Sequence, residues 1–289
     1  MFEKVLIPTD FSKHSRRMLD CIIGIQGIRE IILLHVIEKI PAPLGKEWVE
    51  ASLNDAAEKS LLKEEEHLGA MNPNIRVTSE LTIASDIAGT ILDIAEKNGV
   101  DLIVLSTYGF SLKTGVIIGN VPTSVVCRIS RINVLIIRHK ILKTLIGKAY
   151  EKYCPMIFSR ILCPTDFSEY SLHAINLVTS IQGIGEVILL HVVSQEETKS
   201  QIKESVRAAN LEMEAIRDTL VAKGIRSRAI VKTGDPASHI TRTAEEETVS
   251  VIWISSYGKG CFRDFLLGST VSDVVMKTHH PVLIIRSLN

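Results

Sequence analysis

The chain of 289 residues carries one segment twice. Residues 4–38 and 160–194 align at an offset of 156, and 17 of the 35 aligned positions are identical. Both segments contain the run Pro-Thr-Asp-Phe-Ser, beginning at Pro8 and Pro164, and both reach Leu-Leu-His-Val near their ends. Self-similarity at a fixed spacing is the signature of a repeated structural unit. We therefore expect two copies of one domain.

The ends of the two copies also correspond, because the run Val-Leu-Ile-Ile-Arg occurs at 134–138 and again at 282–286. This predicts a first domain at residues 1–138 and a second at 159–289. Apolar residues in the intervening stretch, 139–158, keep helical spacing until Cys154-Pro155 stops the pattern. We expect a helical linker there.

Short apolar runs alternate with longer helix-periodic stretches inside each copy. In the first copy the runs lie at 4–8, 31–37, 75–81, 101–106 and 133–138. They lack strict polar alternation, as expected of strands buried on both faces. In the second copy an amphipathic helix should end before Gly224, and Asp235-Pro236 has the form of a helix cap followed by a first-turn proline. The alternation predicts an α/β fold, each copy a doubly wound, five-stranded parallel sheet with helices on both faces.

Charge and composition narrow the function classes. The 33 basic residues balance the 33 acidic ones, so no net positive field favours nucleic acid. No apolar run approaches the roughly 18 residues that a membrane span needs. The first residues do not resemble a secretion signal, and the five cysteines are scattered without a C-x-x-C pair. We expect a cytoplasmic protein with reduced thiols, without membrane or nucleic-acid partners.

One candidate binding region is the end of the first strand of each copy, Pro8-Thr9-Asp10 and Pro164-Thr165-Asp166. In a doubly wound sheet, ligands bind beyond the carboxyl ends of the strands. A carboxylate there can accept hydrogen bonds from a ribose or an adenine edge. The alternative is structural: the aspartate, with Ser12 or Ser168, caps the following helix.

A second candidate region is the turn after the fourth strand of the second copy, Ser255 to Gly260, followed by Gly268-Ser269-Thr270 at a predicted helix start. Glycine-permitted turns before a helix can present backbone N–H groups to phosphates. Such turns also occur for purely structural reasons.

Together these residues resemble the universal stress protein family. The resemblance rests on the Pro-Thr-Asp strand end, the Leu-Leu-His-Val strand, the spacing Ser255-x2-Gly258-x9-Gly268-Ser269 and the final apolar strand, and it covers both copies. It implies a tandem member with the adenine nucleotide alpha hydrolase-like fold. Many members of that family bind ATP or AMP through G-x2-G-x9-G-[S/T], and others have lost the motif.

The resemblance implies two sets of nucleotide-binding residues. The preferred set, in the second copy, is Pro164, Thr165, Asp166, Val192, Ser255, Ser256, Gly258, Lys259, Gly268, Ser269 and Thr270. The weaker set, in the first copy, is Pro8, Thr9, Asp10, Val36, Ser106, Gly109, Gly119 and Asn120. The implied cofactor is ATP or AMP, and Mg²⁺ can accompany ATP.

Both copies depart from the family motif. Its first glycine is Ser106 or Ser255 here. The first copy departs further, because Asn120 stands in place of serine or threonine and Pro122 removes a backbone N–H near the helix start. We expect the second copy to be the better nucleotide site.

Other conspicuous residues are not assigned to chemistry. His35 and His191 occupy the same strand position and are expected to bond to backbone in the core, and His279-His280 to lie in a loop. The charge runs at 63–66 and 245–247 are expected on solvated helix faces. No catalytic or metal-binding motif is present in the sequence.

The sequence leaves three hypotheses for function: a sensor or store of an adenine nucleotide, a slow ATPase or phosphotransferase, and an interaction protein that no longer binds nucleotide. The last strands, 133–138 and 281–286, are apolar and should form sheet edges. In the family the corresponding strands pair between subunits. The resemblance thus implies intramolecular pairing of the two repeats and a homodimer of chains.

Overall fold

Two copies of one βα pattern account for the elements of the chain. The computed structural model describes residues 2–39, 47–107, 119–128, 131–138, 157–194, 199–258 and 267–286. These form two compact units, one up to residue 138 and the other from residue 157. Residues 139–156, nearly all of the predicted linker, lie outside the described residues.

Unit 1 is a parallel sheet of the order β3-β2-β1-β4-β5. The strands are β1 (Lys4–Pro8), β2 (Glu30–Glu38), β3 (Arg76–Ala84), β4 (Leu102–Thr107) and β5 (Asn133–Arg138). The helices are α1 (Lys13–Ile22), α2 (Glu47–Met71), α3 (Ile87–Lys97) and α4 (Asn120–Arg128). Val5 of β1 pairs with Ile31 on one side and Leu102 on the other. The strand order therefore reverses between β1 and β4.

Unit 2 repeats this arrangement, with the order β8-β7-β6-β9-β10. Its strands are β6 (Arg160–Pro164), β7 (Glu186–Val193), β8 (Ser227–Thr233), β9 (Val251–Ser255) and β10 (Val282–Ile285). Its helices are α7 (Glu169–Val178), α8 (Lys199–Ala222), α9 (Pro236–Glu246) and α10 (Ser269–Lys277). Ile161 of β6 pairs with Val187 and Val251, so the reversal lies between β6 and β9.

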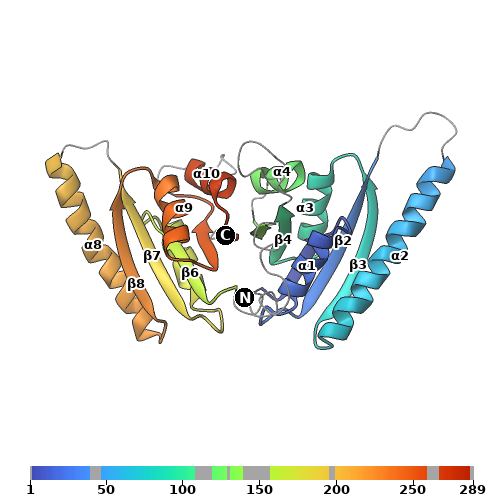
Figure 1. The fold of residues 1–289 in the computed structure, drawn as a ribbon, viewed down its shortest axis with the longest axis horizontal. Helices are drawn as coiled ribbons and strands as arrows, with labels where there is room; N and C mark the ends of the chain where they lie inside the picture. The colour runs from blue at the N-terminus through green and yellow to red at the C-terminus, as the bar shows by residue number, and fades with distance from the viewer. Residues whose placement is uncertain are drawn as a thin grey trace. The chain divides into compact units, whose positions relative to one another are not determined.

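Helices cover both faces of each sheet (Figure 1), which confirms the predicted fold class. In unit 1, α1 contacts α2 and α3 contacts α4. Right-handed crossovers place the first pair on one face and the second pair on the other. Along β1 the side chains of Val5, Leu6 and Ile7 are completely buried. The absence of alternation in the apolar runs follows from this double burial.

The outer strands β3 and β8 differ from the prediction. Their side chains are mostly half-buried, whereas the sequence run was expected to be buried on both faces. Each lies at the end of its unit's strand order beyond β2 or β7 and has one paired neighbour. The helix that covers it, α2 or α8, shields one face. The prediction was wrong here because a sequence run does not show how many neighbours a strand has.

The helix signals of unit 2 are confirmed. Asp235 caps α9 by accepting a hydrogen bond from the Ser238 N–H at 2.8 Å, and Pro236 occupies the first turn. Gly224 follows α8 with φ of +78°, the left-handed conformation that glycine adopts at helix ends. Trp253 of β9 is buried beneath α7, where its Nε1 donates to the Ala174 carbonyl at 2.8 Å.

The predicted solvated face at 245–247 is only partly observed. The Glu247 side chain is 25% exposed and pairs with Arg160 at 3.1 Å and with Arg228. Both arginines also pair with Glu186, each at 3.1 Å. The hydrogen bond from Arg228 holds the pKa of Glu247 below its ordinary value. This network of ion pairs links the amino-terminal ends of β6, β7 and β8 to one another.

The cysteines differ from the prediction. Cys127 and Cys163 are free, but Cys21 is disulfide-bonded, contrary to the expectation of reduced thiols throughout.

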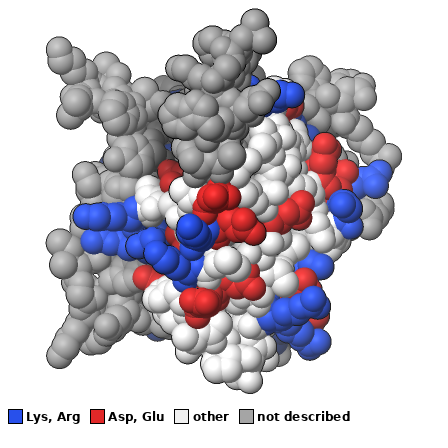
Figure 2. Space-filling model, turned by 90° about the vertical axis from the view of Figure 1, so that its right-hand side faces the viewer, with Lys and Arg blue, Asp and Glu red and all other residues white. Residues whose placement is uncertain are grey.

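Among the described helices none has the length and hydropathy that a membrane crossing requires. Both signs of charge occur on the face in Figure 2, and its described atoms form no continuous basic surface.

Gly69 provides a test of backbone freedom in α2. A Cβ there would meet no atom within 4 Å, and the residue lies inside the helix. Gly69→Ala should raise the free energy of unfolding by about 0.5–1 kcal/mol, measured by urea denaturation, because alanine restricts the unfolded chain more. The matched control is Gly99→Ala: the space is equally open but φ is +61°, so a loss of stability is expected. Stabilisation in the control would contradict this account.

Candidate functional site

The strand ends that were singled out in the sequence form one kind of tight turn in both units. The Asp10 carboxylate accepts a hydrogen bond from the Ser12 N–H at 3.0 Å, and Asp166 accepts one from the Ser168 N–H at 3.0 Å. The Thr9 hydroxyl likewise accepts a hydrogen bond from the Phe11 N–H at 3.1 Å. Between the aspartate and the serine of each turn lies a phenylalanine with positive φ, 59° at Phe11 and 63° at Phe167.

The helix cap and the aspartate have separate tasks. Ser12 and Ser168 cap α1 and α7, each accepting from the N–H three residues on at 3.2 Å. The aspartates instead close the preceding turn. The structural alternative, an aspartate that caps the helix together with Ser12 or Ser168, is confirmed for the serines and not for the aspartates. Serine caps the helix, and each aspartate lies two residues before it, in the lining of a cavity.

The equivalent histidines hydrogen-bond to the backbone of this turn, which confirms their expected bonding to backbone. His35 Nδ1 lies 2.7 Å from the Thr9 carbonyl oxygen and His191 Nδ1 lies 2.8 Å from that of Thr165. Each imidazole also lies against the left-handed phenylalanine, with ring centroids 4.3 Å apart. His280 Nδ1 likewise donates to a backbone carbonyl oxygen, that of Val249, at 2.9 Å, and burial lowers the pKa of this imidazole.

The turn of unit 2 lies in the wall of a cavity beyond the carboxyl ends of β6 and β9, where the strand order reverses. Nine of the residues expected in the second copy line it: Pro164, Thr165, Asp166, Val192, Ser255, Gly258, Gly268, Ser269 and Thr270. Ser256 is 1% exposed and is not in the lining, and Lys259 lies outside the described residues.

The sequence analysis missed further residues in this lining. They are Ser171, Leu190, Pro236, Ile240, Ile254, Tyr257 and Val271. Pro236 and Ile240 stand one turn apart at the start of α9. The signal that was available is the Asp235-Pro236 cap, because it fixes where the apolar face of α9 begins. A helix that starts at the carboxyl edge of the sheet places its first turn beside the ligand crevice.

The glycine-containing turn of unit 2 leads into α10 as expected. Gly268 is the residue before the helix and supplies no side-chain cap. The first hydrogen bond of the helix runs from the Ser272 N–H to the Gly268 carbonyl at 3.0 Å. The N–H groups of Ser269, Thr270 and Val271 precede it and point out of the helix end, which attracts anions.

Gly258 packs closely against Asp166. A Cβ added to it would overlap the Asp166 carboxylate. The glycine of the turn after β9 therefore touches the aspartate of the turn after β6. This contact joins the two regions that were recognised separately in the sequence.

Unit 1 has a corresponding cavity. All but one of the residues expected in the first copy line it: Pro8, Thr9, Asp10, Val36, Ser106, Gly119 and Asn120. The exception, Gly109, lies outside the described residues. His35, Ile87, Ile91 and Pro122 also line the cavity. The histidine was expected only in the core.

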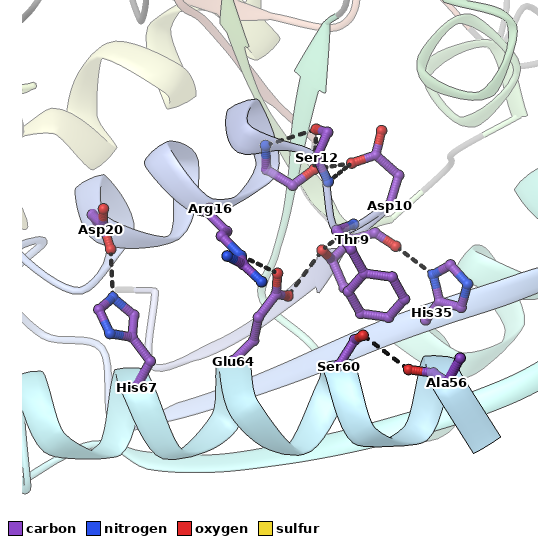
Figure 3. A network of polar contacts seen from close by, with 12 residues as sticks. Thr9, Asp10, Ser12, Arg16, Asp20, His35, Ala56, Ser60, Glu64 and His67 are labelled. Atoms are coloured by element: carbon purple, nitrogen blue, oxygen red, sulfur yellow. Dashed lines mark hydrogen bonds and ion pairs between the residues drawn. The ribbon is translucent and has the colours of Figure 1, made fainter. Parts of the chain in front are cut away.

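A buried carboxylate behind the unit 1 cavity was not expected. Glu64 of α2 is 3% exposed, although the run 63–66 was predicted to be solvated. It accepts a hydrogen bond from the Thr9 hydroxyl at 3.0 Å and lies 3.5 Å from Arg16 Nε of α1 (Figure 3). The prediction failed because Glu64 continues the buried stripe of Ala57, Leu61 and Leu68. That spacing was the signal in the sequence.

Unit 2 solves the same packing problem without charge. Matching the buried stripes of α2 and α8 places Ile216 at the position of Glu64, and the repeat offset places Leu172 at that of Arg16. The Thr165 hydroxyl there shares a hydrogen bond with Ser171 at 2.9 Å. In unit 1 the equivalent Ser15 donates to Asp10 instead.

The two acids of unit 1 are shifted in opposite directions. Burial raises the pKa of Glu64 and outweighs the bonds from Thr9 and Arg16. Burial also raises the pKa of Asp10, but the hydrogen bonds from Ser15 and Ser12 prevail and leave the pKa below its ordinary value. Asp10 thus stays ionised at the cavity.

Comparisons with known proteins agree with this geometry. The family model described as "Universal stress protein family" matches residues 1–138 and 158–286. The chain belongs to the universal stress protein family. It is a tandem member, because the match comprises both repeats.

Relatives of this universal stress protein are known in archaea and bacteria. Universal stress protein MJ0577 of Methanocaldococcus jannaschii is 31% identical over 159 residues, 46% of this chain and 98% of the relative. Universal stress protein YxiE of Bacillus subtilis is 26% identical over 148 residues, 45% of this chain and all of the relative. A crystal structure of a universal stress protein from Archaeoglobus fulgidus has a TM-score of 0.70 at 22% identity, covering 98% of this chain and 96% of that one. At that identity it shows the shared fold.

The buried acid of this universal stress protein should make stability depend on pH. Between the ordinary pKa of 4.5 and the raised value, the folded protein holds a proton that the unfolded chain has lost. The free energy of unfolding then falls as pH rises through that interval. Glu64→Gln cannot titrate, so urea denaturation should show the variant gaining stability relative to wild type from about pH 4.5 upward.

The matched control for this test is Glu58→Gln on the exposed face of the same helix. An equal pH dependence in the control, or a difference between Glu64→Gln and wild type that does not change with pH, would contradict the assignment.

Proposed function

We propose that unit 2 binds an adenine nucleotide, ATP or AMP, and that the protein acts as a sensor or regulatory module whose surface responds to occupancy. The observation that supports this most directly is the shared cavity of the Thr165-Asp166 turn and the start of α10. A hydrogen-bonding carboxylate and a phosphate-attracting helix end face the same space, as a nucleotide requires.

The phosphate end of the proposed site is the first turn of α10. Three successive N–H groups, from Ser269 to Val271, precede the first helical hydrogen bond, and the hydroxyls of Ser269 and Thr270 stand beside them. Backbone N–H groups suit phosphate oxygens because they carry no charge that must be desolvated and are fixed by the helix. If ATP is the ligand, Mg²⁺ would accompany its phosphates.

The nucleoside end of the proposed site is formed by other residues that line the same cavity. The Asp166 carboxylate can accept hydrogen bonds from ribose hydroxyls, and it is positioned by the Ser168 N–H and by contact with Gly258. Val192 and Ile240 supply apolar surface for a planar base. A mostly apolar pocket with a few convergent polar groups is the usual form of a cofactor site.

Assembly is part of the proposal. The last strand of each unit, β5 or β10, pairs with the neighbouring strand β4 or β9 of its own unit. We propose that these apolar strands support pairing of the two repeats and, between chains, a homodimer. An exposed apolar strand edge would otherwise invite aggregation.

The test is ligand release followed by titration. Protein purified without added nucleotide is denatured, and adenine nucleotides in the supernatant are quantified by chromatography. Refolded or nucleotide-stripped protein is then titrated with AMP and with ATP by calorimetry. We expect one strong nucleotide site per chain.

A variant localises that site to unit 2. Gly258→Ala should weaken nucleotide binding by about tenfold or more, because its methyl displaces the Asp166 carboxylate and forfeits a charged hydrogen bond. Gly69→Ala, which lines neither cavity, is the control. Absence of any heat and any released nucleotide would reject the proposal, and unchanged affinity in Gly258→Ala would reject unit 2 as the site.

A further inference from the structure

The two cavities differ at the third residue of the helix that opens beside them. In unit 2 this residue is Val271 of α10, and in unit 1 it is Pro122 of α4. Both line their cavities. The Pro122 ring also covers the residue before the helix, since a Cβ built on Gly119 would lie 3.7 Å from the proline Cδ.

The proline changes what the helix end offers. The first hydrogen bond of α4 runs from the Thr123 N–H to the Gly119 carbonyl at 3.1 Å, so the three residues before Thr123 correspond to the three donors of unit 2. Proline has no N–H, and its ring methylenes occupy that position. A phosphate at this helix end would lose one of three donors and would be desolvated against an apolar ring, which is unfavourable for an anion.

The nucleoside end of the unit 1 cavity keeps the strand-end turn and the apolar helix face of unit 2. The Thr9-Asp10 turn accepts the same two hydrogen bonds from backbone N–H groups as its counterpart, and Ile87 and Ile91 stand where unit 2 has Pro236 and Ile240. Thr9 is additionally fixed by Glu64 (Figure 3). Asp10 is additionally fixed by Ser15. A carboxylate that accepts hydrogen bonds from hydroxyls therefore faces an apolar wall in this unit also.

We infer that unit 1 binds an adenine nucleoside without a phosphate, and that Pro122 sets this selectivity. The inference rests on the proposed function of unit 2, because it assigns the same base and ribose contacts to unit 1. One chain then holds a nucleotide in unit 2 and a nucleoside in unit 1, so it can respond to the ratio of phosphorylated to dephosphorylated ligand.

The test is calorimetric titration of the nucleotide-free full chain with adenosine and, separately, with AMP. Wild type should bind two equivalents of adenosine and one strong equivalent of AMP. Asp10→Ala should remove one adenosine equivalent. Pro122→Val should add a second AMP site by raising the AMP affinity of unit 1 about tenfold or more, since it restores a donor to a charged group.

The reciprocal variant is Val271→Pro, which should lower the ratio of AMP to adenosine affinity in unit 2 by about tenfold or more. Urea denaturation checks that each variant is folded. If a variant is not folded, the numbers of adenosine and AMP equivalents bound by wild type test the inference by themselves. A single adenosine equivalent, or two equal AMP equivalents in wild type, would overturn the inference alone. No binding of either ligand would overturn the proposed function as well.

Discussion

Both cavities depend on a backbone conformation that their sequences disfavour. Phe11 and Phe167 have positive φ, which costs a residue other than glycine roughly 1–2 kcal/mol. The surrounding groups stabilise it: a threonine hydroxyl and an aspartate carboxylate accept N–H groups on either side, and a histidine ring lies against the phenylalanine. Several independent contacts thus hold the turn in this conformation. A rigid turn is what allows a small carboxylate to be presented at the sheet edge in a fixed direction.

The two units hold the same turn by different means. Unit 2 uses a neutral hydroxyl pair under an apolar helix face, whereas unit 1 buries Glu64 in that face and balances it with Arg16. Burying a carboxylate is costly even when it is paired with an arginine that is 57% exposed, so the charged version is not an obvious gain in stability. It makes unit 1 sensitive to proton concentration at a position adjacent to its cavity, and unit 2 has no equivalent group there.

Much of the fold was predictable from the sequence, as were nine of the sixteen residues that line the unit 2 cavity and seven of the sixteen that line the unit 1 cavity. The duplicated Pro-Thr-Asp-Phe-Ser run located the turn, and the helix signal at Asp235-Pro236 fixed the start of α9. Failures occurred where the outcome depends on neighbours. β3 was expected to be fully buried because a run does not reveal an outer strand, and Glu64 was expected in solvent because four successive charged residues obscured the apolar stripe. The disulfide at Cys21 could not be inferred because pairing needs proximity in space.

The packing of Trp253 has an optical consequence. Its indole is 1% exposed, belongs to β9 two residues before Ser255, and donates to a carbonyl of α7. The elements it joins both end or begin beside the unit 2 cavity. The emission colour of a buried, hydrogen-bonded indole depends on the polarity and rigidity around it, so this side chain is a built-in fluorophore on the strand whose next two residues, Ile254 and Ser255, line the unit 2 cavity.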